Sequence, residues 1–427
     1  MIKKLYNKHK ETGQNFLWRS LQVFSKYGVA AAIYFIAAKL LEPEDFGLLN
    51  YLRAAVALLM IVCDFGLSYA TFKFAAEYDT LKSEKLNRLL FSVSALVVAL
   101  AATISIVTIL FGHRIFKDNY RYIILFLPYL FLMPLTSVID GIYRGLKQFK
   151  KLALISSIVG VFSLFASFFL INRFYLVGAI LAQNTMYLLL VLSLYAFQKK
   201  FKFEFDKSVI RDVLKYAMVL GIGLLAHFLY GRIDMLILKQ FGYLVEIGYY
   251  GIVNSIFLLL FIPFGILGQV IAPNTTRHIT TGDFAEIKSK LKKYAVLSVT
   301  AGIAMSVLVY IGLPIILKAF LPKYHTAGFL LIMNILLLLL PFKVWGSVLS
   351  QGFVLPAGYA KISTAAVLIG GVLNVILDYV FIGIFGFVGV FWVTLMVHSM
   401  AVSVVTIFFY MKVNVKSRAQ KGRKNPL

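Results

Sequence analysis

The sequence is short of charge, of acidic residues and of cysteine. Only 14% of its 427 residues are charged, against about 25% in soluble globular proteins. Asp and Glu number 18 against 43 Lys and Arg, which leaves a net charge of +25. The single cysteine, Cys63, excludes an internal disulfide and a cysteine metal cluster, so the redox compartment stays open. These shortages exclude an ordinary soluble domain.

What the sequence has instead is long apolar runs, with 60% hydrophobic residues overall. A stretch such as LLFSVSALVVALAATISIVTILF (89–111) exceeds the roughly 20 helical residues that cross a bilayer core. Its unbroken apolar character excludes the alternation of a β-barrel. We therefore predict an all-α polytopic membrane protein with about twelve spans, at 16–41, 46–72, 86–112, 119–146, 152–172, 174–198, 212–240, 245–272, 292–317, 325–352, 358–382 and 386–411.

The basic residues predict the topology. Lys and Arg concentrate in alternate loops, on the side that also holds both ends of the chain, so we expect both termini on the cytoplasmic side of the membrane. The first sixteen residues lack the apolar core of a removable signal peptide, and the first span should stay as an anchor. Lys and Arg residues are scattered over short loops. This distribution favours attraction to an anionic lipid surface over binding to nucleic acid.

The polar segment QKKFKFEFDKSVIRD (198–212) divides the chain into two sets of six spans. An offset of 201 residues aligns DFG (45–47) with EIG (246–248), and a later match pairs Gly145 with Gly352. We predict two parallel six-helix lobes, 1–205 and 206–411, followed by a basic cytoplasmic tail, 412–427. With so few identities, chance matching is the alternative.

Charged side chains inside the first two spans indicate an anion site. A charge at membrane depth costs about 2.5–3.5 kcal/mol, so each should face a partner or a wet cavity. Arg19 and Lys26 lie seven residues apart on one helical face, and Arg53 stands on the second span. We interpret them as the wall of a cavity that binds an anionic headgroup. The alternative is salt bridging between helices, for example from Lys26 to Asp64.

Four further polar sets stand inside spans. Asp140 and Arg144, four residues apart, have the spacing of an ion pair within one helix. Pro341 should kink the tenth span. Lys343 follows it two residues later and either lines a cavity or has a structural role. Asn374 and Asp378 follow a Gly-Gly pair and either bind a coupling cation or join helices, whereas His398 with Thr394 is typical of an interhelical hydrogen bond.

The stretch HFLYGRIDMLIL (227–238) places an arginine and an aspartate inside the seventh span. Two residues apart on a helix, Arg232 and Asp234 do not face each other. Asp234 shares its predicted face with His227, and these two are candidates for ion or proton coupling. Arg232 is a candidate for a substrate contact or for a bridge between the lobes. A structural role is the alternative for each.

Three stretches resemble bacterial polysaccharide flippases of the Wzx type, in the superfamily of multidrug, oligosaccharidyl-lipid and polysaccharide exporters. The segment 37–78 holds the turn LLEPEDFGL between the first two spans and the element DFGL that ends the second. The segment 232–273 is similar to the R-x-D, G-x-Y and proline pattern of the seventh and eighth spans. The element GGVLNVILDYVFIGIFGFVGVFWVT (370–394) resembles a late family motif, with Val390 and Phe391 where small residues are usual.

The resemblance implies a flippase that moves an undecaprenyl-pyrophosphate-linked oligosaccharide from the inner to the outer leaflet, for O-antigen, capsule or related polymers. It implies two lobes that alternate in access, a polymerase and chain-length proteins as partners, and no cofactor beyond a coupling ion, H⁺ or Na⁺. In related lipid II flippases, arginines on the first two spans bind substrate, and Arg19 and Arg53 sit in comparable places. Those relatives carry fourteen spans, so twelve argues against that branch.

Two other functions compete with that of a flippase. Multidrug exporters of the same superfamily also have twelve spans, but they typically use carboxylates on the first helix, where this chain has Lys26. In such an exporter, Asp64, Asp234 or Asp378 would carry the coupling ion. A membrane-embedded enzyme would need a nucleophile and a base at motif spacing, and the outer loops offer only scattered carboxylates. We therefore expect a transporter and no catalytic or metal site.

Overall fold

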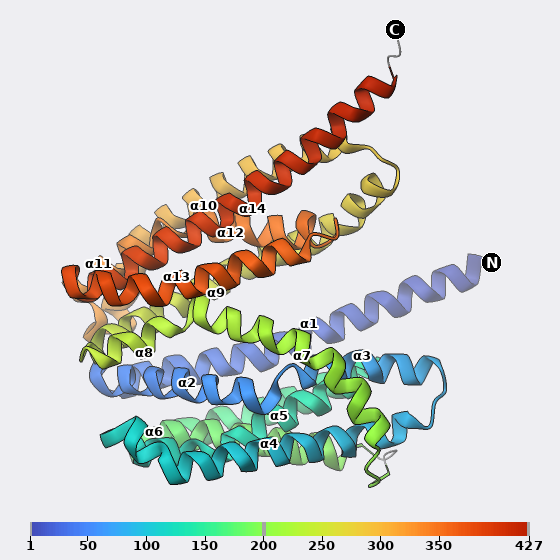
Figure 1. Cartoon of the computed structure of the whole chain (residues 1–427). Helices are drawn as coiled ribbons and strands as arrows, with labels where there is room; N and C mark the ends of the chain where they lie inside the picture. The colour runs from blue at the N-terminus through green and yellow to red at the C-terminus, as the bar shows by residue number, and fades with distance from the viewer. Residues whose placement is uncertain (1, 199–201, 425–427) are drawn as a thin grey trace. The chain divides into compact units, whose positions relative to one another are not determined.

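The computed structural model describes residues 2–198 and 202–424, and within these it is helical throughout, without a strand (Figure 1). Of the predicted basic tail, residues 425–427 and the side chains from 419 onward lie outside the described part, as do residues 199–201 of the linker. The helices are α1 Ile2–Leu40, α2 Pro43–Asp64, α3 Leu67–Thr80, α4 Lys85–Phe116, α5 Tyr120–Gly145, α6 Phe149–Ala196, α7 Lys207–Gly231, α8 Ile233–Gln240, α9 Leu244–Thr280, α10 Phe284–Phe320, α11 Ala327–Leu337, α12 Leu340–Leu349, α13 Ala360–Phe385 and α14 Phe387–Lys424.

The predicted spans are confirmed. Ten helical stretches among the described residues are long and apolar enough to cross a membrane, and two of them contain a chain reversal. The stretch Lys85–Gly145 is α4 and α5 joined by a short 3₁₀ turn at Lys117–Asn119, and α6 is broken at Tyr175. Each of these two holds two predicted spans, so the ten stretches account for about twelve.

The break in α6 is a reversal without a loop. Tyr175 has a φ of 49° and a ψ of −123°, outside the helical region. Eight residues of straight helix would separate Leu170 from Gly178 by about 12 Å, yet a Cβ on Gly178 would overlap the carbonyl oxygen of Leu170. The two arms of α6 therefore fold back on each other, and only glycine fits at the point of contact.

The same device joins α13 to α14. Gly386 has a φ of 62° and a ψ of −152°, and a Cβ on Gly389 would overlap the carbonyl oxygen of Phe381, again eight residues earlier. Both reversals carry the pattern Phe-x-x-Val-Gly, at 174–178 and 385–389. Each half of the chain thus ends in a hairpin of two directly connected helices.

Three other predicted spans are interrupted, and the sequence predicted the last of these interruptions but not the first two. The second span breaks after α2, at Phe65 and Gly66, which both have positive φ values of 36° and 82°. The seventh breaks at Arg232, between α7 and α8. The tenth span breaks before Pro341, where the missing N–H of proline predicted a kink. The later part of this span widens into a π-helical turn at Ser350–Val354.

The chain separates into two compact units, Met1–Leu225 and Ala226–Leu427, so the division falls inside α7. The early part of α7 belongs to unit 1, because Val209, Val213 and Ala217 are fully buried in the core that α3, α4 and α5 form. The predicted lobes, 1–205 and 206–411, place all of α7 in the second lobe, whereas its early part belongs to unit 1. That the two lobes move as separate bodies stays a prediction.

The linker before α7 is bound to the start of α4. Arg88 pairs with Glu204 at 2.8 Å and with Asp206 at 3.5 Å, and the amide of Asp206 donates to the hydroxyl of Ser92 at 2.9 Å. The Ser208 hydroxyl and amide donate to Asp206 at 2.7 and 2.8 Å, and these bonds lower the pKa of the Asp206 carboxyl below its ordinary value. The described linker residues therefore hold the first turns of α7 against unit 1.

Close glycine contacts pack the second and fourth spans of each half. In unit 1, a Cβ on Gly145 of α5 would lie 2.6 Å from the Cβ of Ala75 on α3. In unit 2, Gly352 stands against α9, where a Cβ would lie 3.3 Å from the Cα of Gly268. The two glycines that the sequence paired thus occupy comparable contacts, each in its own unit.

We expect Gly178→Ala to lower the stability of the protein. The added methyl group has to displace the backbone of the other arm of α6, and overpacking of this kind costs about 1–3 kcal/mol. Gly312→Ala on α10 is the matched control, since a Cβ there meets no described atom within 4 Å. The unfolding temperature in detergent should fall for Gly178→Ala only; an equal unfolding temperature for both variants would contradict the reversal at Tyr175.

Candidate functional site

Unit 1 holds a cationic cluster formed by Arg19, Gln22, Lys26, Asp140 and Arg144. Arg144 pairs with Asp140 at 2.6 Å on α5, and the amide of Gln22 donates to the other oxygen of Asp140 at 3.2 Å. Arg19 donates to the side-chain oxygen of Gln22. Asp140, Arg144 and Arg19 all act electrostatically on Lys26. Three cations of two helices thus share one carboxylate, which leaves an excess of positive charge.

The predicted ion pair between Asp140 and Arg144 is confirmed, but it is not an isolated surface pair. It joins α5 to the stripe that Arg19 and Lys26 form on α1. The alternative partner for Lys26, Asp64, accepts from the amide and the hydroxyl of Ser68 at 3.1 and 3.0 Å, where it caps the start of α3. Among the described residues no ion pair joins Lys26 to Asp64.

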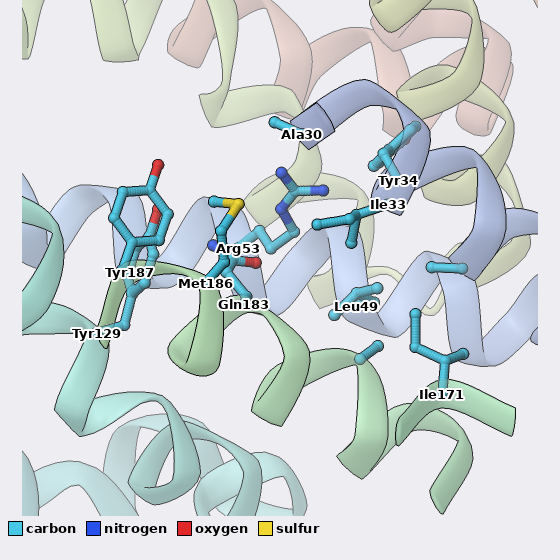
Figure 2. Close-up of a pocket in the computed structure, with 12 residues that line it drawn as sticks. Ala30, Ile33, Tyr34, Leu49, Arg53, Tyr129, Ile171, Gln183, Met186 and Tyr187 are labelled. Atoms are coloured by element: carbon cyan, nitrogen blue, oxygen red, sulfur yellow. The ribbon is translucent and has the colours of Figure 1, made fainter. Parts of the chain in front are cut away.

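Arg53 lies apart from the cationic cluster, in a pocket of unit 1. The pocket has an empty volume of about 490 Å³, part of it open, and Figure 2 shows its lining. The guanidinium of Arg53 stands 5.1 Å from the ring centre of Tyr34, whose hydroxyl donates to Asn50 at 2.9 Å. The residues that line the pocket are Ala30, Ile33, Tyr34, Ala37, Leu49, Arg53, Tyr129, Ile171, Ala179, Gln183, Met186 and Tyr187.

The chemistry of this unit 1 pocket suits an anion that carries a polar, ring-shaped group. Arg53 is the single charged residue in its described lining, and no carboxylate is part of that lining. A guanidinium binds phosphate oxygens through paired N–H donors. At one end of the pocket in Figure 2, the rings of Tyr129 and Tyr187 stand perpendicular, 5.1 Å apart, and Gln183 is drawn next to Met186, closer to Arg53. Tyrosines offer an apolar face and a hydrogen-bonding edge to a ligand.

Unit 2 contains a buried acid cluster around Asp234, on the first turn of α8. The carboxylate of Asp234 is fully buried and accepts from Tyr250 at 2.9 Å, from Asn374 at 2.5 Å and from Thr394 at 3.0 Å. Asp378, also fully buried, lies 3.4 Å from the amide nitrogen of Asn374 and interacts with Asp234. Four helices, α8, α9, α13 and α14, therefore meet at one pair of carboxyl groups.

Glycines on α13 allow this meeting. A Cβ on Gly370 would lie 2.9 Å from the ring of Tyr230, and a Cβ on Gly371 would lie 2.9 Å from the Cβ of Leu229. The close approach brings Asn374, one turn later, to Asp234. Beside it, His398 contacts the carbonyl oxygen of Tyr230 at 2.6 Å, which fits the predicted interhelical hydrogen bond, and stacks on the Tyr230 ring at 3.8 Å.

The remaining predicted residues lie at the edge of this cluster or outside it. Lys343 stands 5.7 Å from the ring centre of Tyr230 and acts electrostatically on His398. His227 and Arg232 are exposed, and the break at Arg232 interrupts the helical face that Asp234 and His227 were expected to share. The structure thus brings together Asp234 with Asp378, and Arg19 with Lys26, while Arg53, Asp64 and His227 stand separately.

Sequence reasoning missed the aromatic residues of both sites. Tyr34, Tyr129 and Tyr187 line the pocket of Arg53, and Tyr250 donates to Asp234. The chain has 24 tyrosines, so single tyrosines in apolar spans carry no signal. The spacing of Asn374 and Asp378 was a usable signal, because two polar side chains one turn apart in a membrane helix need a common partner.

Comparisons with known proteins agree with this fold. The family model described as "Polysaccharide biosynthesis protein" matches residues 12–278, and the MatE model matches residues 220–380. An uncharacterized membrane protein of Methanocaldococcus jannaschii is 27% identical over 413 residues, covering 92% of this chain and 95% of that protein.

Solved structures of membrane transporters share the architecture. The inward-facing structure of a MATE family multidrug transporter has a TM-score of 0.75 at 16% identity and covers 95% of this chain and 99% of its own. The inward closed structure of the lipid II flippase MurJ has a TM-score of 0.73 at 18% identity, and the match covers 95% of this chain and 91% of the MurJ chain. A transporter from Pyrococcus furiosus has a TM-score of 0.62 at 15% identity and covers 94% of each chain.

We expect Asp140→Leu to destabilise unit 1, because it removes the one carboxylate that Arg144, Arg19 and Lys26 share at membrane depth. Removal of one partner from a buried set of charges costs about 3 kcal/mol or more. Arg144→Leu should unfold at a higher temperature than Asp140→Leu, because Asp140 then keeps the hydrogen bond from Gln22 and the two cations of α1. If the two variants unfold together, Asp140 does not hold the cluster in this way.

Proposed function

Because the chain belongs to the polysaccharide biosynthesis protein family, whose model matches residues 12–278, we propose that it is a flippase for a lipid-linked oligosaccharide. In this proposal it moves an undecaprenyl-pyrophosphate-linked glycan from the inner to the outer leaflet of the cytoplasmic membrane, for O-antigen, capsule or a related polymer. Family and fold support a membrane transporter of the superfamily. The lipid carrier, the polymer and the partner polymerase and chain-length proteins belong to the proposal.

One observation carries the proposal, the position of Arg53 as the single charge in the described lining of the unit 1 pocket. A pyrophosphate headgroup needs a fixed cation in a place that water reaches, and a sugar needs tyrosine and amide edges. Arg53, Tyr129, Tyr187 and Gln183 supply both in one pocket. An exporter of organic cations would instead favour a carboxylate at such a position.

The cationic cluster would serve as a second anion site in unit 1. Arg19 and Lys26 carry positive charge that the single carboxylate of Asp140 does not balance, since Arg144 already pairs with it. We assign Asp140 the role of an internal counter-anion, which keeps three cations together when no phosphate is bound. Lys343 and Arg232 are assigned weaker substrate contacts on unit 2.

The acid cluster of unit 2 would hold the coupling ion, H⁺ or Na⁺. Two adjoining buried carboxyl groups are both ionised only when a cation lies between them, and otherwise one of them holds a proton. One oxygen of Asp378 and the side-chain oxygen of Asn374 are buried without a hydrogen-bond partner among the described residues. Together with Asp234 and Thr394 they form a set of oxygen ligands suited to a hard cation. Asp64 and His227 are weaker candidates for the ion site, because Asp64 already accepts hydrogen bonds from Ser68 and His227 is exposed.

Cation-coupled export of drugs or metabolites is the second candidate function. The MatE model matches residues 220–380, a segment that holds Asp234, Asn374 and Asp378, and a multidrug transporter shares the fold. The acid cluster serves both functions equally, because either kind of transport needs an energy source. The lining of the unit 1 pocket separates them, and a panel of dyes and drugs in a deletion strain tests the alternative directly.

We expect Arg53→Ala to weaken substrate binding at least tenfold, since hydrogen bonds to a charged group contribute about 1.5–3 kcal/mol. Arg53→Lys should retain part of the affinity, as a point charge without the paired donors. The measurement is flipping of a fluorescent polyprenyl-pyrophosphate-linked oligosaccharide in proteoliposomes, with Lys39→Ala, an exposed change on α1, as control. Normal flipping by Arg53→Ala in correctly inserted protein would reject the site.

We expect Asp378→Asn and Asp234→Asn to abolish the dependence of transport on the coupling ion. Each removes one negative charge from the cation ligands while keeping the shape of the side chain. Transport should be measured in proteoliposomes with an imposed pH gradient and, separately, with an imposed Na⁺ gradient. Stimulation by the same gradient in wild type and in both variants would show that the acid cluster is structural.

A further inference from the structure

A second pocket lies at one end of unit 2, where several membrane helices end together. The last turn of α9, the first turn of α10, the turn before α13 and the late part of α14 enclose it, with an empty volume of about 260 Å³. Most of its lining is apolar or aromatic. The lining residues are Ile279, Phe284, Ile287, Ala357, Tyr359, Phe409, Lys412, Val413 and Lys416.

Two lysines supply the charge of this unit 2 pocket. Lys412 and Lys416 are one helical turn apart on α14, so their side chains lie on the same face. The ammonium of Lys416 stands 5.2 Å from the ring centre of Phe284 and 6.0 Å from that of Tyr359, and that of Lys412 stands 5.6 Å from Phe408. The lining rings of Phe284 and Tyr359 hold Lys416 at the pocket without neutralising its charge, and Lys412 lines the pocket from the same face of α14.

No carboxylate balances these two lysines within the described part of the chain. The nearby acids of α10 already have partners, since Glu286 pairs with Lys290 at 3.5 Å and Asp283 with His278 at 3.5 Å. Lys288 of α10 donates to Asn414 of α14 at 2.8 Å, which ties two walls of the pocket together. The pocket is therefore a fixed, positively charged site with an apolar floor.

Its position fits the boundary between hydrocarbon and water. Residues 387–411 of α14 contain no Asp, Glu, Lys or Arg and exceed the roughly 20 helical residues that cross a bilayer core, and Lys412 and Lys416 follow this stretch directly. Ile287, Phe409 and Val413 are buried within the pocket floor, whereas both lysines are exposed. A ligand here would place an anionic group at the helix ends and an apolar part against the floor.

We propose that this pocket binds an anionic glycerophospholipid, with the headgroup phosphate between Lys412 and Lys416 and the start of an acyl chain over Ile287, Phe409 and Val413. Free phosphate fits less well, because exposed lysines without a guanidinium fork or converging backbone amides bind it weakly. Each lysine near an anionic lipid surface contributes about fivefold to affinity, and each buried methylene about fourfold. A glycerophospholipid therefore gains affinity both from the two lysines and from the apolar floor of the pocket.

The proposal does not rest on the flippase function, and its test measures lipid binding without transport. Protein in nonionic detergent is titrated with short-chain phosphatidylglycerol, with short-chain phosphatidylcholine and with inorganic phosphate, and unfolding temperature reports binding. Lys412→Gln with Lys416→Gln should weaken phosphatidylglycerol binding about 25-fold and leave phosphatidylcholine unaffected. Lys292→Gln with Lys293→Gln, both exposed on α10 outside the pocket, is the matched control and should bind as wild type.

A third variant tests the apolar floor. Ala357→Leu fills the pocket without changing its charge and should weaken phosphatidylglycerol severalfold. A photoreactive phosphatidylglycerol should label peptides around 279–287 or 409–416. The proposal is overturned if the lysine pair and its control bind phosphatidylglycerol equally. It is also overturned if inorganic phosphate stabilises the protein as strongly as the lipid, or if labelling lies elsewhere.

Discussion

The structure depends on one constraint, that a charge inside hydrocarbon needs a partner within reach. In unit 1, Asp140 satisfies Arg144 on its own helix and Gln22 on α1, so a pair of short contacts fixes two helices far apart in the sequence. In unit 2, Asp234 is satisfied by neutral donors from α9, α13 and α14. The polar residues therefore determine how the apolar helices are assembled, although they make up little of the chain.

The two units resolve that constraint with opposite charge. The cationic cluster and Arg53 leave unit 1 with excess positive charge at membrane depth, whereas the acid cluster gives unit 2 two adjoining carboxyl groups. An anionic substrate and a coupling cation would accordingly have separate places in the chain. Such a separation allows each site to be tuned without placing the ligands of one beside the other, which would let substrate and ion neutralise each other.

Sequence alone predicted what is local. Apolar runs of bilayer length gave about twelve spans, Pro341 marked a break, and the spacing of four gave the pair of Asp140 and Arg144. It could not predict contacts between helices, since the residues that surround Asp234 come from positions 250, 374 and 394. The sequence also predicted one continuous helical face from His227 to Asp234. In the structure the backbone leaves the helical conformation at Arg232, between these two residues.

The loopless reversal at Gly386 has a consequence for how the acid cluster can change. Asn374 and Asp378 stand on one arm of this hairpin and Thr394 on the other, and the glycine contact at Gly389 locks the two arms into a single stiff body. The spacing of those three side chains is therefore built in. Asp234 and Tyr250 reach them from α8 and α9, next to the break at Arg232. We therefore expect a change in the cluster to move Asp234 and Tyr250 relative to the α13–α14 hairpin.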